Sequence, residues 1–74
     1  MKKFSEDQLE VLENGASGAF YRGVHIWTRN GRPVGRAVWA LKKRGLVSVT
    51  EYRNGPGLSY TDDGRKVRSE LGFV

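Results

Sequence analysis

Apolar residues near the start of the chain recur at the spacing of a helix. Leu9 and Leu12 lie three residues apart and share one helical face. Ser5 is suited to the N-cap, because its hydroxyl can accept from the free amides of the first turn, and Gln8 completes a capping box. A glycine then follows an asparagine, which is typical of a helix end. The pattern predicts a helix over residues 6–14.

The next region changes to the composition of β-structure. We expect a loop over residues 15–19, followed by a strand over 20–28, which is rich in aromatic and β-branched residues. The Asn-Gly pair at 30–31 is a strong hairpin signal, so residues 32–34 form a short return strand whose proline must lie on an edge. The alternative for this region is an irregular helix over residues 19–26.

A second helical pattern follows, from residue 35 or 36 to residue 44. Ala37, Val38 and Leu41 share one face at helical spacing. Three cations occupy the last turn, where the helix dipole favours positive charge. The glycine and leucine that come next can close a Schellman-type turn.

The remaining sequence predicts a hairpin and a last helix. Residues 46–52 are typical of a strand, residues 53–57 have turn composition throughout, and residues 58–60 form the return strand. Thr61 then caps a helix over residues 62–71, whose first turn contains two aspartates.

Together these elements predict an α+β fold with three helices and one or two β-hairpins. The length of 74 residues corresponds to one domain, residues 1–74, with a thin hydrophobic core. The large residues expected to build this core are Phe4, Leu9, Leu12, Phe20, Ile26, Trp27, Val38, Leu41, Leu46, Val49, Tyr60, Val67 and Leu71.

The formal net charge of +5 is unevenly distributed. Residues 1–21 have a net charge of −2, residues 22–53 carry eight cations and one carboxylate, and residues 54–74 are neutral. Segregated positive charge indicates a polyanionic or acidic partner. The alternative is a solvated basic face that keeps a small protein in solution.

Several function classes find little support in the composition. The chain has no cysteine, which excludes disulfides and thiolate metal sites, and a single histidine, His25. We expect no cofactor, no metal, no catalytic residues and no enzymatic activity. The charged N-terminus and the lack of a long apolar run predict a cytoplasmic protein that does not enter a membrane.

Two segments carry a specific likeness to a known family: Ala37-Val38-Trp39-Ala40-Leu41-Lys42-Lys43-Arg44-Gly45-Leu46-Val47 and Leu58-Ser59-Tyr60-Thr61-Asp62-Asp63-Gly64-Arg65-Lys66-Val67. They resemble the winged helix-turn-helix superfamily. The resemblance implies that the first segment contains the recognition helix, that the hairpin after it is the wing, and that the second segment opens the last helix. Residues 15–34 depart from the superfamily, which usually has a helix there. The chain is similar to compact winged-helix proteins of phage-type genomes in which a β-segment replaces that helix.

The resemblance implies a small phage or bacterial transcriptional regulator that binds double-stranded DNA, in a bacterial cell or a phage-infected host. Arg36, Ala40 and Lys43 would face the groove, because these side chains suit a guanine edge, a thymine methyl and a phosphate. The complete set of expected DNA-contacting residues is Arg29, Arg32, Arg36, Ala40, Lys42, Lys43, Arg44, Arg53 and Asn54. Homodimer formation is left open.

Two other functions remain as alternatives. The first is a protein-interaction or adaptor module without direct DNA binding, in which an exposed Trp39 would anchor the partner. We expect instead that Trp39 packs on residues 20–28, because a small core needs the area. The second alternative is single-strand binding by stacking of Phe20, Tyr21 and Trp27, although core packing is the favoured role of these three aromatics.

Overall fold

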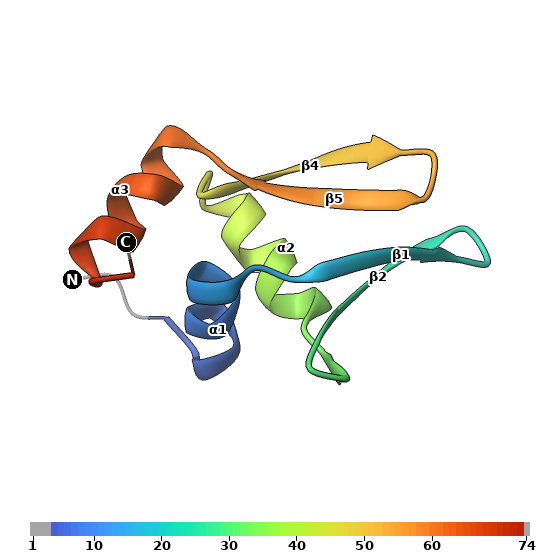
Figure 1. The fold of residues 1–74 in the computed structure, drawn as a ribbon, viewed down its shortest axis with the longest axis horizontal. Helices are drawn as coiled ribbons and strands as arrows, with labels where there is room; N and C mark the ends of the chain where they lie inside the picture. The colour runs from blue at the N-terminus through green and yellow to red at the C-terminus, as the bar shows by residue number, and fades with distance from the viewer. Residues whose placement is uncertain (1–3, 74) are drawn as a thin grey trace.

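The computed structural model describes residues 4–73. Figure 1 shows a small α+β fold in which three helices and two antiparallel sheets make up the described part of the chain. The elements in chain order are α1 (Glu6–Asn14), β1 (Ser17–Tyr21), β2 (Val24–Arg29), β3 (Arg32–Pro33), α2 (Gly35–Lys43), β4 (Val47–Tyr52), β5 (Gly55–Tyr60) and α3 (Asp62–Glu70).

The described chain is elongated, with principal extents of 38 × 22 × 20 Å. The helices gather at one end, and the β1–β2 and β4–β5 hairpins extend from them in the same direction (Figure 1). The first sheet has the strand order β1-β2-β3, and the second contains β4 and β5 alone. We call the two projecting hairpins, residues 17–29 and 47–60, the arm.

The first helix is confirmed with its predicted bounds and cap. The Ser5 hydroxyl accepts from the Gln8 amide at 3.2 Å, and the Gln8 side chain accepts from the Ser5 amide at 3.2 Å. These reciprocal bonds satisfy two amide groups that the helix leaves free. At the other end Gly15 has φ 79° and its amide bonds to the Val11 carbonyl. The predicted capping box and glycine stop therefore both form.

The region after this helix differs from the prediction. Residues 20–21 and 24–28 are strand as expected, but the prediction of one continuous strand over 20–28 is wrong, because the chain reverses at Arg22 and Gly23, which both have positive φ. The expected loop over residues 15–19 is also wrong, since most of it forms β1. The alternative helix over residues 19–26 does not form. The hairpin at residues 30–31 is confirmed, and its return strand, β3, lies at the edge of the sheet, where a proline is tolerated.

The second helix ends at Lys43, one residue before the predicted end, and has the predicted glycine stop. Gly45 has φ 77°, and its amide bonds to the Lys42 carbonyl at 3.0 Å. The Leu46 amide bonds to the Leu41 carbonyl at 3.0 Å, which completes the Schellman motif. At the start of the helix Val34 provides no side-chain cap. The end of α2 is thus better determined by its sequence than its beginning.

The second hairpin has a shorter turn than predicted. Strand β5 begins at Gly55, and Tyr52 pairs directly with it, so only residues 53–54 form the turn. The last helix is capped by Thr61 as expected: its hydroxyl accepts from the Gly64 amide at 3.0 Å. Helix α3 ends at Glu70, one residue before the predicted end.

Gly64 has a packing role that its helix propensity does not suggest. It is buried, and a Cβ atom at this position would overlap the Leu46 carbonyl. The Thr61 amide donates to that same carbonyl at 3.1 Å, and the Thr61 hydroxyl donates to the Gly45 carbonyl at 2.6 Å. The glycine therefore allows the start of α3 to lie against the end of α2.

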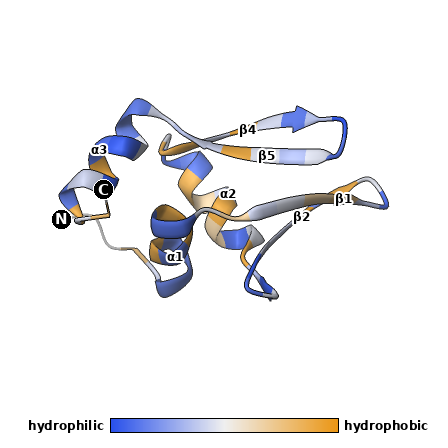
Figure 2. Ribbon diagram, viewed as in Figure 1, coloured by the Kyte–Doolittle hydropathy of each residue, from blue (hydrophilic) through white to orange (hydrophobic). Residues whose placement is uncertain are grey.

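The core is built mainly by α1, α2 and the residues next to them. Figure 2 shows hydrophobic positions where α1 and α2 meet and a hydrophilic turn at the outer end of the β4–β5 hairpin. The predictions of Phe20, Ile26 and Leu71 as core residues are wrong, since these side chains are exposed. The buried residues are Val11, Leu12, Trp27, Val34, Ala37, Val38, Leu41, Leu46, Val47 and Val67.

The two hairpins of the arm contact each other closely. A Cβ atom on Gly18 would overlap the Pro56 carbonyl and would lie 2.8 Å from the Trp27 ring. Further out, Gly55 lies against the Ala19 backbone. Glycine is thus needed where β1 approaches β5, although the two strands belong to separate sheets.

Candidate nucleic-acid interface

Helix α2 directs three of the predicted DNA-contacting residues away from the core. Arg36 and Lys43 are exposed and Ala40 is half-buried, while Ala37, Val38 and Leu41 face inward. The spacing of the outward residues follows from helix geometry, because positions three and four apart lie on one face. Within residues 4–73, Arg36 and Lys43 have no ion-pair partner. Their charges are available to a ligand.

Trp39 is 63% exposed, so the expectation that it packs on residues 20–28 is wrong. The Lys42 ammonium lies 5.8 Å from the centre of the Trp39 ring, within the range of a cation–π contact. This pair extends the outward surface of α2 with an aromatic face and a second cation.

A hollow of about 420 Å³ lies beside Trp39. Its lining combines residues of α2 with residues of both hairpins: Gly23, Val24, His25, Trp27, Trp39, Lys42 and Val49. The wall is largely apolar, and Val24 is itself 60% exposed. An exposed tryptophan beside an apolar hollow is typical of a surface that contacts a partner.

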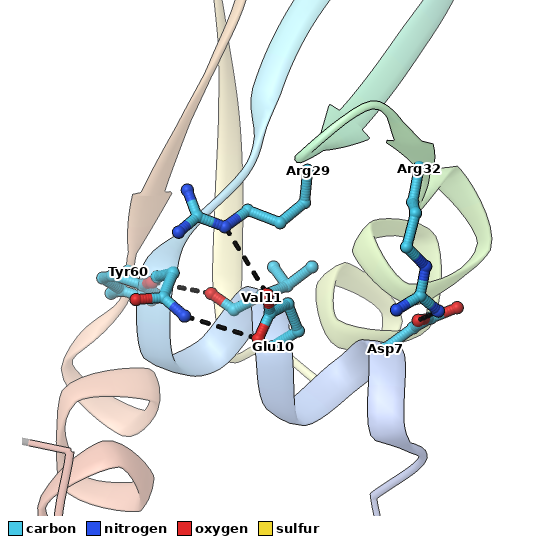
Figure 3. A network of polar contacts seen from close by, with 7 residues as sticks. Asp7, Glu10, Val11, Arg29, Arg32 and Tyr60 are labelled. Atoms are coloured by element: carbon cyan, nitrogen blue, oxygen red, sulfur yellow. Dashed lines mark hydrogen bonds and ion pairs between the residues drawn. The ribbon is translucent and has the colours of Figure 1, made fainter.

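Arg29 and Arg32 lie in a different environment, against helix α1. Figure 3 shows both side chains directed toward carboxylates of α1: Arg29 lies 3.7 Å from Glu10, and Arg32 forms an ion pair with Asp7. The Arg29 Nε atom is buried, with no hydrogen bond. Both cations thus attach the β2–β3 turn to α1, and their charge is already compensated.

Arg44 packs its guanidinium over the Phe4 ring, 4.4 Å from the ring centre. This contact attaches the segment before α1 to the end of α2. Arg44 therefore has a structural role in addition to the phosphate contact that the sequence predicts for it.

Arg53 and Asn54 form the exposed turn of the β4–β5 hairpin, as predicted for a wing tip. Within the described residues Arg53 has no ion-pair partner. A second hollow, of about 330 Å³, lies at this turn and is lined by Phe20, Glu51, Tyr52, Arg53, Asn54 and Gly55. The structure thus places Arg53 and Asn54 together with a residue of the other hairpin.

The outer end of the arm has three exposed aromatics: Phe20 and Tyr21, which belong to the single-strand-binding alternative, and Tyr52, which was in no predicted set. Phe20, Tyr21 and Tyr52 are each more than half exposed, whereas Trp27 is buried and cannot stack on a ligand. The Arg22 guanidinium lies 5.4 Å from the centre of the Tyr21 ring. A signal was present in the sequence: both hairpin turns contain Tyr-Arg shortly before glycine, at 21–23 and 52–55.

Arg68 was missed as well, and its role is structural. Its guanidinium donates to the Leu12 carbonyl at 2.6 Å and to the Glu13 and Phe73 carbonyls at 3.2 Å. It also lies 4.5 Å from the centre of the Tyr60 ring. Arg68 therefore satisfies carbonyls that the C-terminus of α1 leaves free.

Tyr60 completes this cap from strand β5. Its hydroxyl donates to the Val11 carbonyl at 2.7 Å (Figure 3). Burial raises the pKa of the Tyr60 hydroxyl above its ordinary value of 10.0, against the opposing effect of the nearby Arg68 and Arg29 charges. The neutral, donating form is thus favoured in the folded protein.

Residues 4–73 contain no group of three or more His, Cys, Asp or Glu side chains that could hold a metal ion. None of the helices described there is long and apolar enough to cross a membrane.

No protein-family model, curated protein or solved structure matches the chain.

Proposed function

We propose that this protein binds double-stranded DNA in the manner of a winged helix, with α2 as the recognition helix and the β4–β5 hairpin as the wing. The observation that carries the proposal is the outward face of α2. It presents Arg36 and Lys43 without carboxylate partners in the described chain, and Lys42 beside them. Unpaired cations on a helix can reach both phosphates and base edges in a major groove.

The arrangement of acidic groups supports this choice of surface. Glu10 and Asp7 of α1 compensate Arg29 and Arg32. The three carboxylates of α3 equal its cations in number, and Asp62 pairs with Arg65. Excess positive charge therefore remains on α2 and on the turns of the arm. In the proposed complex α2 lies in the groove, and Arg53 meets a phosphate beside it.

The test is the salt dependence of affinity for a random duplex, measured by fluorescence anisotropy of the labelled DNA. The logarithm of the binding constant should fall linearly with the logarithm of salt concentration, with a slope of about −0.9 per phosphate neutralised. Lys43→Ala should reduce the magnitude of that slope by about 1, and Arg36→Ala should weaken binding by about 1–3 kcal/mol if this arginine contacts a guanine.

Lys66→Ala is the matched control, because it removes one exposed cation from α3 and changes the net charge equally. Equal losses for Lys43→Ala and Lys66→Ala would indicate an effect of overall charge and would contradict a site on α2. Duplex affinity that does not change with salt concentration would also contradict the proposal.

A second candidate function, protein interaction without DNA binding, is favoured by the exposure of Trp39 beside the larger hollow. An aromatic anchor next to an apolar recess is typical of an interface hot spot. Under this function Trp39→Ala abolishes capture of the partner, whereas Arg36→Ala has little effect. Retention of the partner by the Trp39→Ala variant would exclude it.

A further inference from the structure

The smaller hollow at the outer end of the arm brings together two exposed aromatic rings from different hairpins. Phe20 belongs to β1 and Tyr52 to β4, yet both line the same recess. Phe20 is 56% exposed and Tyr52 is 62% exposed, so neither ring contributes a large buried area to the fold. Large apolar groups kept at the surface in one place mark a binding site.

Each ring is held in position by a specific neighbour. The Phe20 ring makes an edge contact with His25, with ring centres 5.5 Å apart and an interplanar angle of 64°. His25 is held in turn by Glu51 at 2.9 Å, a contact that joins the two hairpins. The recess therefore has one aromatic wall whose orientation depends on both hairpins.

The second wall is fixed by a glycine. The Tyr52 ring lies over Gly57 of the neighbouring strand, where a Cβ atom would be only 2.5 Å from the Tyr52 Cε2 atom. One part of the ring is thus held against the hairpin, while more than half of the Tyr52 side chain remains exposed to solvent. A ligand that stacks here meets a ring that has already lost much of its conformational freedom, which favours affinity.

The polar residues that line the recess are Glu51, Arg53 and Asn54. Glu51 is already bound to His25, so Arg53 and Asn54 define what kind of planar group the recess would take. Asn54 supplies an amide that both donates and accepts hydrogen bonds, as the polar edge of a nucleobase requires. Arg53 supplies a guanidinium without an ion-pair partner in the described chain, which suits a phosphate. Stacking surfaces combined with positive charge are the usual means of binding unpaired bases.

We propose that this recess, formed by Phe20, Tyr52, Arg53 and Asn54, binds one unpaired nucleobase and its phosphate. The volume of about 330 Å³ is at the lower end of the range for small-molecule sites, as expected for a single planar group. The inference rests on the proposed DNA-binding function and adds to it: the protein prefers duplex that adjoins a single strand, with α2 on the duplex and the recess on the first unpaired base.

The experiment compares three labelled DNA probes by anisotropy at one salt concentration. They are a blunt duplex, the same duplex with a four-thymidine overhang, and a thymidine oligonucleotide alone. The wild-type protein should bind the overhang duplex about 5- to 150-fold more tightly than the blunt one, the range expected for stacking on one base. Phe20→Leu and Tyr52→Leu should remove this preference, because leucine keeps apolar bulk but has no ring.

Two further variants serve as controls. Tyr21→Leu removes an exposed ring that does not line the recess, and the preference for the overhang should persist. Tyr52→Trp keeps an aromatic ring at this position and should therefore keep the preference for the overhang that Tyr52→Leu removes. Thermal unfolding of every variant establishes that each one is folded in the assay.

The outcomes separate this inference from the proposed function. Equal affinity for blunt and overhang duplexes overturns the inference and leaves duplex binding intact. Binding of the thymidine oligonucleotide that depends on Phe20 and Tyr52, without any duplex binding, supports the recess and overturns the proposed function. A preference for the overhang that survives Phe20→Leu and Tyr52→Leu also overturns the inference, and no binding to any probe overturns both.

Discussion

The helical end of the molecule and the arm use apolar residues in opposite ways. Around α1 and α2, large side chains such as Leu12 and Leu41 are completely buried. In the arm, Phe20, Tyr21 and Tyr52 remain more than half exposed, although the two hairpins approach closely at glycines and are joined by the His25–Glu51 pair. Apolar side chains thus stabilise one end, whereas at the other end they are available to a partner.

This contrast distinguishes the residues that stabilise the fold from the residues that are available to a ligand. A chain of 74 residues has a small core, so an aromatic side chain left at the surface withholds apolar area that could stabilise the fold. Positive charge follows the same division. Arg29, Arg32 and Arg68 are bound to groups of α1, while Arg36, Lys43 and Arg53 extend into solvent without ion-pair partners in the described chain.

The largest expected effect comes from removing core volume at the helical end. Leu41→Ala should lower the free energy of unfolding by about 2–5 kcal/mol, because the side chain is fully buried and a cavity is left behind. Phe20→Ala deletes a larger side chain from the arm and should change stability by only about 0.5 kcal/mol. Urea unfolding followed by circular dichroism measures both, and similar losses for the two variants would remove the distinction between the two ends.

The next effect tests the contact between α3 and Leu46, in the turn that follows α2. Gly64→Ala should destabilise by about 1–3 kcal/mol, because the added methyl group overlaps the Leu46 carbonyl. Gly35→Ala is the matched change, since nothing lies within 4 Å of a Cβ atom there, and it should stabilise by about 0.4–1 kcal/mol. Helix propensity alone predicts stabilisation in both cases, so a stabilised Gly64→Ala protein would contradict the close packing.

The smallest effect concerns the cap that β5 provides to α1. Tyr60→Phe removes the hydrogen bond to the Val11 carbonyl and should cost about 0.5–1.5 kcal/mol at neutral pH. Because the pKa of Tyr60 is raised on folding, its contribution is present below about pH 10 and is lost as the pH rises through the folded-state value.

The difference in stability between wild type and Tyr60→Phe should therefore shrink in alkaline solution. Denaturant unfolding on both sides of about pH 10 measures this, since that is where the unfolded chain titrates. Tyr52→Phe, which alters an exposed hydroxyl, is the control and should show no such change. A difference that is constant or grows with pH would exclude the hydroxyl as a donor in the folded state.

Local signals in the sequence predicted the helices well and the first hairpin only in part. Caps and stops such as Ser5, Gly15, Gly45 and Thr61 act through bonds to residues a few positions away, so they are legible without tertiary information. The turn at Arg22 was missed because arginine rarely adopts positive φ, and an uninterrupted run of β-forming residues hid the reversal.

The candidate site was predictable on α2 and at the β4–β5 turn, but not where separate elements meet. Helical phase alone directs Arg36, Ala40 and Lys43 outward. The pairing of Arg29 with Glu10 and the recess between Phe20 and Tyr52 join residues far apart in the chain. Such contacts depend on how the hairpins lie relative to the helices, which no local pattern encodes.

The cap at the end of α1 has a consequence for biosynthesis. Helix α1 is translated before β5 and α3, so Tyr60 and Arg68 follow 49 and 56 residues after the carbonyls they bind. Until both have emerged from the ribosome, the Leu12 and Glu13 carbonyls lack their Arg68 donor, and the Val11 carbonyl has only the Gly15 amide. We therefore expect the last turn of α1 to remain frayed on the ribosome and to become stably ordered only when β5 and α3 have been made.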